Sequence, residues 1–281
     1  MDHHVIGVVG ASGGLGASTL AVALAVRAGP LVGVSACVDG RPRAGGVDVT
    51  ACVEHLPGLR WGDLADLRGR VDGAALLRAL PGEGSLRVLA ARGDPPGSVT
   101  VRAAVEGLAT VAGLVVLDTG ADPELLDLCT AVVVLAGVSA RRLADAGALV
   151  QRGVLPGDAL LVLRGARREP VAPEDVAVHL DLPLAGVLRD DPRVRADEDR
   201  ARLPGSRARG AVESVADRLL ALAGVARAQR AAVATTTTVA TTVGPGGPLT
   251  SPSTPSTPSS ASSASSGPGA EPAAVSRGGG L

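Results

Sequence analysis

The amino-acid sequence predicts an α/β fold, a doubly wound and mostly parallel sheet with helices on both faces. Seven short apolar runs alternate along the chain with segments of helical periodicity, which is the order expected of successive strand–helix–strand units. The apolar runs lack alternating polar residues, as expected of strands whose two faces are both covered by helices. A glycine-rich loop also separates the first apolar run from the first helical segment.

The seven apolar runs give the predicted strands, in chain order. They are His4–Gly10, Leu31–Asp39, Leu86–Arg92, Leu114–Asp118, Ala131–Gly137, Ala159–Arg164 and Leu184–Leu188.

Helical periodicity predicts the segments between these strands and one helix that closes the domain. They are Ala17–Ala28, Asp72–Leu80, Ser98–Ala112, Pro123–Cys129, Ser139–Gly153, Pro173–Leu180 and Val212–Ala223. Acidic residues are interspersed with the arginines of Arg189–Arg209, so this stretch is predicted to be a solvated loop rather than a nucleic-acid surface.

A change in composition divides the chain into a domain, residues 1–225, and a tail, residues 226–281. From Ala231 onward the sequence consists almost entirely of Ala, Thr, Ser, Pro, Gly and Val, and only Glu271 and Arg277 are charged. Such a segment buries too little apolar surface to offset the entropy cost of ordering, so the tail is predicted to be disordered.

Composition excludes several kinds of chemistry. The chain has no Lys, Tyr, Phe or Asn, and its 27 basic residues are all Arg. Schiff-base chemistry and Tyr–Lys redox catalysis are therefore excluded. The formal charge of −1 gives no general attraction to nucleic acid. Three cysteines without CxxC spacing, Cys37, Cys52 and Cys129, are typical of small buried residues in a reduced cytosol.

The longest strongly apolar run, Ala131–Val138, is much shorter than the ~18 residues that span a bilayer. The chain is therefore expected to be cytoplasmic and to lack a transmembrane segment.

The strongest local signal is the stretch GASGGLGAST, Gly10–Thr19, which lies where the first strand leads into the first helix. Glycines let the backbone approach a ligand closely, and the N-terminus of a helix presents free N–H groups to an anion. The stretch therefore predicts a phosphate cradle. Its expected ligand-binding residues are Gly13, Gly14, Leu15, Gly16, Ala17, Ser18 and Thr19.

The same stretch resembles the nucleotide-binding loops of two families. Gly10, Gly14 and Gly16 fit the TGxxxGxG turn of short-chain dehydrogenases. The residues from Ser12 to Thr19 resemble the deviant P-loop, xKGGxGK[ST], of MinD/ParA ATPases.

Three observations favour the P-loop. The dehydrogenase family uses Tyr, Lys and Asn, all absent here. Asp39 lies 29 residues after Gly10, at the offset of the first switch-I Asp in the MinD/ParA class, whereas a ribose-binding acid is expected ~20 residues on. The run Leu114–Leu117, which ends in Asp118, resembles a Walker B strand.

Within that class, the segment Gly45–Pro81, with its Leu59-Arg60-Trp61 stretch, resembles the actinobacterial CpaE-like, or septum-site-determining, proteins. The resemblance implies ATP and Mg²⁺ as cofactors, with the metal near Ser18, Asp39 and Asp118. It also implies that Pro192 lies near the adenine and that Arg164 stands where many relatives have a base-contacting Asn.

The partners implied by the same resemblance are a second copy of the chain, in a homodimer, and proteins of cell division or of Flp/tight-adherence pilus secretion. Such partners would recruit the chain to the membrane or septum.

The sequence departs from the family at the positions that matter for hydrolysis. The P-loop lysine is replaced by Ala17, the second, deviant lysine by Ser12, and the second switch-I aspartate by Arg41. Because phosphoryl transfer depends on charge placed at the transferring group, nucleotide binding is expected with negligible or slow hydrolysis and no catalytic residue is assigned. The alternatives are a slow but genuine ATPase, a non-catalytic NAD(P)-binding regulator of the dehydrogenase fold, and a scaffold without a ligand.

Overall fold

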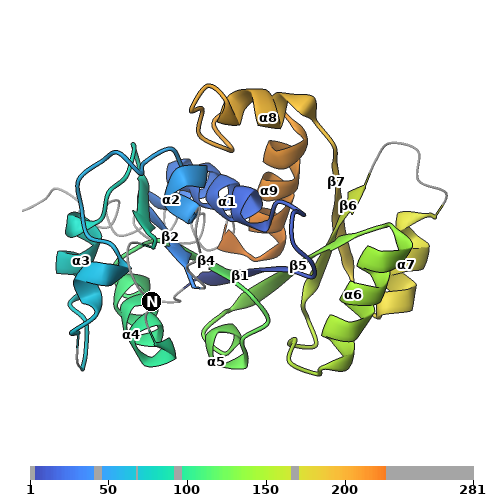
Figure 1. Cartoon of the computed structure of the whole chain (residues 1–281), viewed down its shortest axis with the longest axis horizontal. Helices are drawn as coiled ribbons and strands as arrows, with labels where there is room; N and C mark the ends of the chain where they lie inside the picture. Colours follow the sequence, from blue (N-terminus) through green and yellow to red (C-terminus); the bar gives the residue numbers. More distant parts are fainter. Residues whose placement is uncertain (1–3, 41–45, 68, 92–96, 166–170, 226–281) are drawn as a thin grey trace, which may run out of the picture.

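A computed structural model describes residues 4–40, 46–67, 69–91, 97–165 and 171–225. Seven strands form one sheet in the order β3-β2-β4-β1-β5-β6-β7, and every pair of neighbours is parallel (Figure 1). The strands are β1 (Val5–Gly10), β2 (Ser35–Asp39), β3 (Leu86–Leu89), β4 (Leu114–Thr119), β5 (Ala131–Gly137), β6 (Leu160–Gly165) and β7 (Leu184–Arg189). The predicted doubly wound fold is confirmed.

Helices cover both faces of the sheet. One face packs against α1 (Ala17–Val32) and α9 (Ala211–Leu222), which also contact each other. On the other face, α3 (Gly73–Ala79) and α4 (Ser98–Ala109) cover one half of the sheet, and α6 (Ala140–Gln151) and α7 (Pro173–Leu180) cover the other half, as Figure 1 shows. The short helix α5 (Pro123–Leu126) lies beside α4.

Successive side chains of β1 point to opposite faces, as the two-residue period of a strand requires. Ile6 and Val8 belong to the core under α1 and α9, whereas Val5 and Val9 belong to the cores on the opposite face. This explains why the strand is apolar without interruption. Each fully buried Val, Leu or Ile contributes about 1.5–3 kcal/mol relative to an exposed one.

The predicted elements are all present, with one clear error at a boundary. Residues Leu31 and Val32 were predicted to open the second strand, but helix α1 continues through Pro30 to Val32 and β2 begins at Ser35. Both side chains pack against the core of the α1 face. This burial offsets the hydrogen bond that the proline removes, and Gly33, at φ +83°, then ends the helix.

Three short helices were not predicted. They are α2 (Val47–Thr50), the 3₁₀ helix η1 (Trp61–Leu64) and α8 (Pro192–Glu198). Helix α8 corrects the prediction of a loop throughout Arg189–Arg209. The side chain of Asp191 caps this helix by accepting from Arg193 N at 2.9 Å, and Pro192 occupies its first turn. Asp followed by Pro is a recognised helix-start signal that could have identified it.

The three cysteines are free thiols, as expected, but only Cys37 is fully buried, while Cys52 and Cys129 are partly exposed. Among the helices of the described ranges, none has both the length and the apolar character needed to cross a bilayer. The predicted disordered tail, residues 226–281, lies outside the described residues.

Candidate functional site

The glycine loop joins β1 to α1 and leaves backbone groups exposed at the start of that helix. Gly14 and Gly16 have φ values of +73° and +89°, which disfavour other residues. Gly16 precedes the first residue of α1, and its carbonyl accepts the hydrogen bond from Leu20 N at 2.9 Å. The side chain of Leu15 is buried and anchors the loop, whereas Gly13 and Gly14 are exposed.

One polar atom of the loop lacks a partner. Ser12 Oγ is buried and makes no hydrogen bond; among the described residues only His4 Nε2 shares this condition. Buried polar atoms are normally satisfied. Together with the open backbone at Gly13 and Gly14, this orphaned hydroxyl fits a loop that receives a ligand with hydrogen-bonding oxygens.

Two predicted metal-binding carboxylates lie at the ends of neighbouring strands. Asp39 ends β2 and is paired in register with Asp118 of β4. Burial raises the pKa of the Asp118 carboxyl, and a hydrogen bond from the Ser18 hydroxyl partly offsets that rise. The three residues that the resemblance assigns to Mg²⁺ therefore converge beside the start of α1.

The thiol of Cys37 lies under this acid pair. Burial raises the pKa of Cys37 strongly, and the nearby carboxylates of Asp118 and Asp39 raise it further. The site therefore concentrates negative charge, which suits a hard divalent cation that keeps part of its coordination for water and phosphate. In the described part of the chain, no group of three or more His, Cys, Asp or Glu residues is arranged to hold a metal by itself.

Trp61 connects Asp39 to the segment that follows β2. Its indole Nε1 donates a hydrogen bond to the Asp39 carbonyl oxygen at 2.8 Å, and its own backbone N–H donates to Ala90 O at 3.0 Å. The side chain is 1% exposed. The backbone of Gly46 also lies close to Asp39, because a Cβ on Gly46 would stand 3.0 Å from Asp39 Oδ2.

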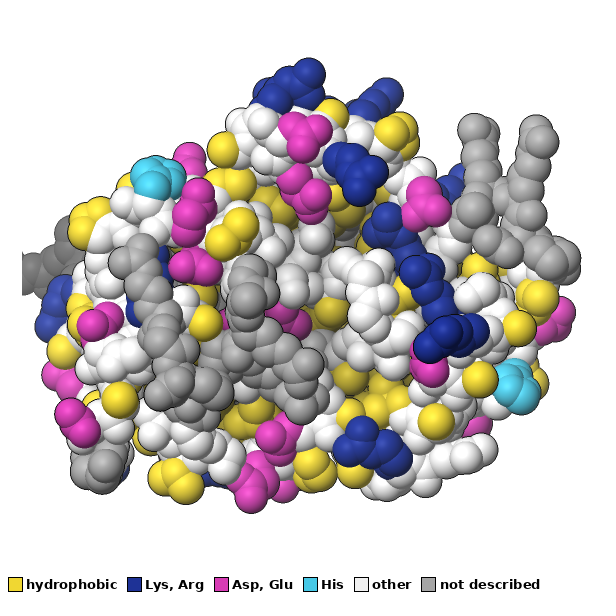
Figure 2. All heavy atoms as spheres, viewed as in Figure 1, with side chains coloured by type: hydrophobic (Ala, Val, Ile, Leu, Met, Phe, Trp, Pro, Cys, Tyr) yellow, Lys and Arg dark blue, Asp and Glu magenta, His cyan; other side chains and the backbone are white. Residues whose placement is uncertain are grey.

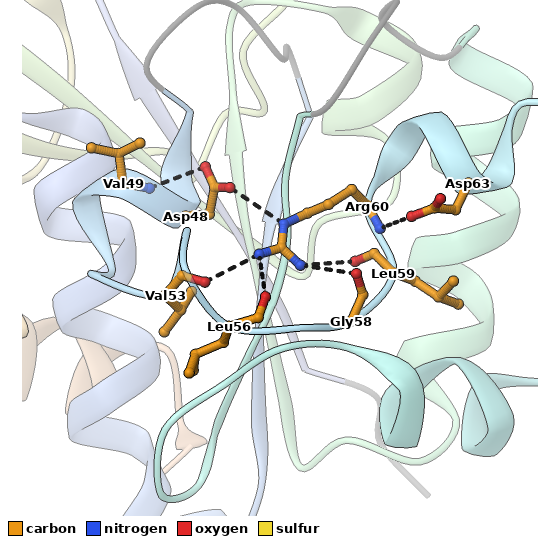
Figure 3. A network of polar contacts seen from close by, with 8 residues as sticks. All are labelled: Asp48, Val49, Val53, Leu56, Gly58, Leu59, Arg60 and Asp63. Carbon is orange, nitrogen blue, oxygen red and sulfur yellow. Dashed lines mark hydrogen bonds and ion pairs between the residues drawn. The ribbon is translucent and has the colours of Figure 1, made fainter.

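A buried arginine organises this segment. The Arg60 guanidinium donates to Asp48 Oδ2 at 3.3 Å and surrounds itself with backbone carbonyls (Figure 3). The carbonyl acceptors are those of Val53, Leu56, Gly58 and Leu59, at 3.1–3.5 Å. Arg60 therefore folds residues 48–60 around its side chain and holds Trp61 under Asp39. The sequence singled out Leu59-Arg60-Trp61 by resemblance only and did not indicate this role.

A cleft of about 510 Å³ opens beside the glycine loop. Gly14, Gly16 and Thr19 line one side, and Pro192 with other residues of α8 lines the opposite side. The predicted cradle and the predicted base-side residue thus share one cavity. Basic and acidic side chains are mixed over α8, at the top of Figure 2.

Arg164 also reaches the cradle, which was not anticipated. It belongs to β6, and its Nη1 lies 3.4 Å from the position that a Cβ on Gly16 would occupy. Its Nε donates to Asp190 Oδ1 at 2.7 Å. The signal was available, because Arg164 lies at the carboxyl end of a parallel strand, the edge where ligands bind in such sheets. Arg41, the replacement at switch I, lies outside the described residues.

Comparison with solved structures identifies the architecture. A ParA family ATPase from Chlorobium tepidum TLS superimposes with a TM-score of 0.66 and 16% identity, covering 76% of this chain and 96% of that one. The septum site-determining protein MinD of Pyrococcus horikoshii OT3, solved with Mg-ADP, gives a TM-score of 0.59 and 19% identity over 79% and 98% of the two chains. The chain has the MinD/ParA fold.

The sequence relatives add little about activity. The uncharacterised protein Rv3660c of Mycobacterium tuberculosis strain H37Rv is 33% identical over 225 residues, 77% of this chain. This chain spans 63% of that relative's length. No protein-family model matches the sequence.

The order of the strands also bears on the two loop resemblances. In the dinucleotide-binding fold, strand 2 lies directly beside strand 1. Here β4 lies between β1 and β2, so Asp39 stands two strands away from the glycine loop's strand and beside Asp118. The order of the sheet therefore disfavours the dehydrogenase interpretation, in which an acid at the end of strand 2 binds the ribose.

Proposed function

We propose that the chain binds Mg²⁺ with ATP or ADP at the glycine loop and acts as a nucleotide-dependent regulatory or positioning protein. The observation that carries this proposal is the joint position of the open loop and the Ser18–Asp118 hydrogen bond at one end of α1. The loop supplies N–H donors, and the helix N-terminus favours an anion. Gly13, Gly14, Leu15, Gly16, Ala17, Ser18 and Thr19 would hold the phosphates, and Pro192 would lie by the base.

Mg²⁺ would be held by Ser18, Asp39 and Asp118. This donor set fits the ion, which usually takes one or two carboxylates together with phosphate oxygens and water. The bound ion would neutralise phosphate charge. The residues of the loop would hold the phosphates in one orientation.

Hydrolysis is proposed to be negligible. The described cradle presents Ala17 and Ser12 where active members of this fold class are expected to carry lysines, and the chain contains no lysine anywhere. Loss of one charge-assisted hydrogen bond, about 1.5–3 kcal/mol, weakens affinity about 10- to 100-fold and leaves binding measurable. Turnover suffers more, because it depends on charge stabilisation at the transferring phosphate. Release of phosphate from Mg-ATP at a rate that Asp118→Ala abolishes would favour the slow-ATPase alternative.

The binding test uses thermal unfolding of the full chain with Mg-ATP, Mg-ADP, Mg-GTP or NADP. A ligand at 100 times its dissociation constant adds about 2.7 kcal/mol to stability, and this raises Tm by about 5–10 °C in a domain of this size. A rise with Mg-ATP and Mg-ADP is expected. A rise with NADP alone would contradict the proposal, and no rise with any ligand would favour a ligand-free scaffold.

The two ends of α1 provide a matched pair of variants. Gly16 and Gly33 both have positive φ, +89° and +83°, so an alanine at either position strains the backbone by at least about 1–2 kcal/mol, and Gly33→Ala, at ψ −65° rather than +31°, is the more strained of the two. Only Gly16 belongs to the cradle. The Tm rise with Mg-ADP should disappear in Gly16→Ala and persist in Gly33→Ala. Equal responses of the two variants would show that binding occurs elsewhere.

The cellular role is proposed from the resemblance to CpaE-like and septum-site-determining proteins. The chain would form a homodimer and act with partner proteins in septum placement or in Flp/tight-adherence pilus secretion. Analytical ultracentrifugation with and without Mg-ATP tests the dimer. Deletion of the gene, scored separately for septum position and for pilus assembly, tests the two processes.

A further inference from the structure

The geometry points to Arg164 as the cationic phosphate contact of the cradle, in place of the two missing lysines. This inference rests on the proposed nucleotide binding at the glycine loop. The guanidinium lies directly against the loop, with Nη1 3.4 Å from the Cβ position of Gly16, and Arg164 lines the same cleft as Gly14 and Thr19.

Asp190 holds the Arg164 guanidinium by one edge. The bond from Nε to Asp190 Oδ1 is the one hydrogen bond that Arg164 makes within the described residues. A guanidinium carries five N–H donors in a planar fork, and within the described residues none accepts a hydrogen bond from the four on the Nη atoms, of which Nη1 lies beside the loop. The pair is partly exposed, with side-chain exposures of 24% and 60%, and such pairs add little to stability. Asp190 therefore orients the Arg164 guanidinium through Nε alone.

The charges of the cleft make this arginine decisive. Besides Arg164, its lining holds one other basic residue, Arg195, against the three acids Asp190, Asp191 and Glu198. The lining thus carries two positive against three negative formal charges, and without Arg164 the net negative charge would double. With it, a planar group suited to bidentate phosphate binding stands next to the backbone N–H groups.

The order of the sheet places this cation and the metal-binding acids on opposite sides of the cradle. Asp118 lies on β4, next to β1 on one side, and Arg164 lies on β6, the second strand on the other side. Three strand spacings of about 4.8 Å separate β4 from β6, or roughly 14 Å. The phosphate chain would therefore be clamped between Mg²⁺ at one end and Arg164 at the other, and a diphosphate would retain the arginine contact.

Equilibrium dialysis of the full chain against radiolabelled Mg-ADP tests this assignment. Arg164→Ala should weaken binding about 10- to 100-fold, the loss of a charge-assisted contact, and Arg164→Lys should recover part of it. Arg102→Ala is the matched control, because it removes the same charge from α4, where Arg102 bonds to Glu124 O. The control should bind like the wild type. Displacement of ADP by inorganic pyrophosphate, which has no base, should weaken in parallel in Arg164→Ala.

The experiment distinguishes failure of the proposed function from failure of the Arg164 assignment. If the wild type binds no Mg-ADP at millimolar concentration, the proposed function itself fails. If the wild type binds and Arg164→Ala binds as Arg102→Ala does, only the role of Arg164 fails. Tighter binding by Arg164→Ala would mean that the side chain obstructs the loop. Weaker ADP binding with unchanged pyrophosphate displacement would place Arg164 at the base. Either result overturns the phosphate assignment.

Discussion

Replacing Arg60 with methionine tests whether this buried guanidinium holds residues 48–60 together. The substitution keeps an unbranched apolar stem of similar reach and removes every donor of the head group. Arg60 is 1% exposed, and its guanidinium bonds to Asp48 and to four backbone carbonyls. Few side chains in the described residues concentrate so many polar contacts away from solvent.

The expected loss of stability follows from the polar groups that Arg60→Met leaves without a partner. Asp48 is 5% exposed, so Arg60→Met strands a buried carboxylate without its cation, which typically costs 3–5 kcal/mol. The carbonyls also lose their donor, but water entering the space left by the head group limits that addition. We therefore expect the free energy of unfolding to fall by about 3–5 kcal/mol. Such a loss is a large fraction of a domain's usual 5–15 kcal/mol.

Urea unfolding followed by far-ultraviolet circular dichroism measures this change. Circular dichroism is preferred to Trp61 fluorescence, because Trp61 is the neighbour of Arg60 and its signal would respond to the substitution itself. A double-mutant cycle with Asp48→Asn isolates the ion pair. Asn keeps an oxygen for Val49 N, which bonds to Asp48 Oδ1 at 3.0 Å, while the charge is removed. The double variant should be more stable than the sum of the single effects predicts, with a coupling energy of about 1–3 kcal/mol.

Arg60→Lys refines the test. A lysine retains the charge but has three donors on one nitrogen, so it cannot reach the acceptors that lie along both edges of the planar guanidinium. An intermediate loss of stability is expected. A loss below about 1 kcal/mol for Arg60→Met, or a coupling energy near zero, would refute the idea that Arg60 organises this segment.

The remaining predictions concern the acid pair, the single tryptophan and one thiol. Because burial raises the pKa of Asp118, its charge destabilises the fold, and stability falls as the pH rises from the unfolded-state pKa near 3.8 through the folded-state value. Asp118→Asn should raise the free energy of unfolding at pH 7 by about 0.5–2 kcal/mol, and urea titrations at pH 3 should show the difference vanish. Trp61 donates to the carbonyl of Asp39, a proposed Mg²⁺ ligand, so Mg-ADP should change the Trp61 fluorescence saturably. ADP without Mg²⁺ should give no change, and Asp39→Ala should abolish the change seen with Mg-ADP. Burial raises the pKa of Cys129 to about 12. At pH 8 the native thiol should react with iodoacetamide about a thousand-fold more slowly than free cysteine, and mass spectrometry should find it labelled only after unfolding.

The sequence predicted the strands well because their burial on both faces leaves an uninterrupted apolar signal. Leu114–Leu117 and Ala131–Ala136 are such runs, and both become central strands. Periodicity did not predict the local structure where single polar side chains organise the backbone. Residues 48–61 have no repeating pattern, because their arrangement depends on the guanidinium of Arg60 and on the indole of Trp61. No local rule assigns a buried position to an arginine.

The site was predictable to the extent that it lies on regular elements. Ser18, Asp39 and Asp118 stand at the ends of predicted elements, and parallel strands bring their carboxyl ends to one edge. Arg164 was considered only as a residue on the base side. Its approach to Gly16 depends on the β1–β5–β6 neighbourhood, which chain order does not reveal. Which strands become neighbours is a tertiary property, so contacts across them need the structure.

A chain whose basic residues are all Arg raises the question of which arginines reflect composition and which are required. Arg102, partly exposed and paired with Glu106 four residues on, could be lysine with little effect, because such a helix-surface pair is worth about 0.3–0.5 kcal/mol. Arg60 uses both edges of its planar head group. Arg164 donates from Nε to Asp190 and keeps Nη1 beside the loop, 3.4 Å from the Cβ position of Gly16. The last two roles need a rigid fork rather than a point charge. Lysine is therefore expected to serve only in part at these two positions, with an intermediate loss of stability in Arg60→Lys and partial recovery of binding in Arg164→Lys.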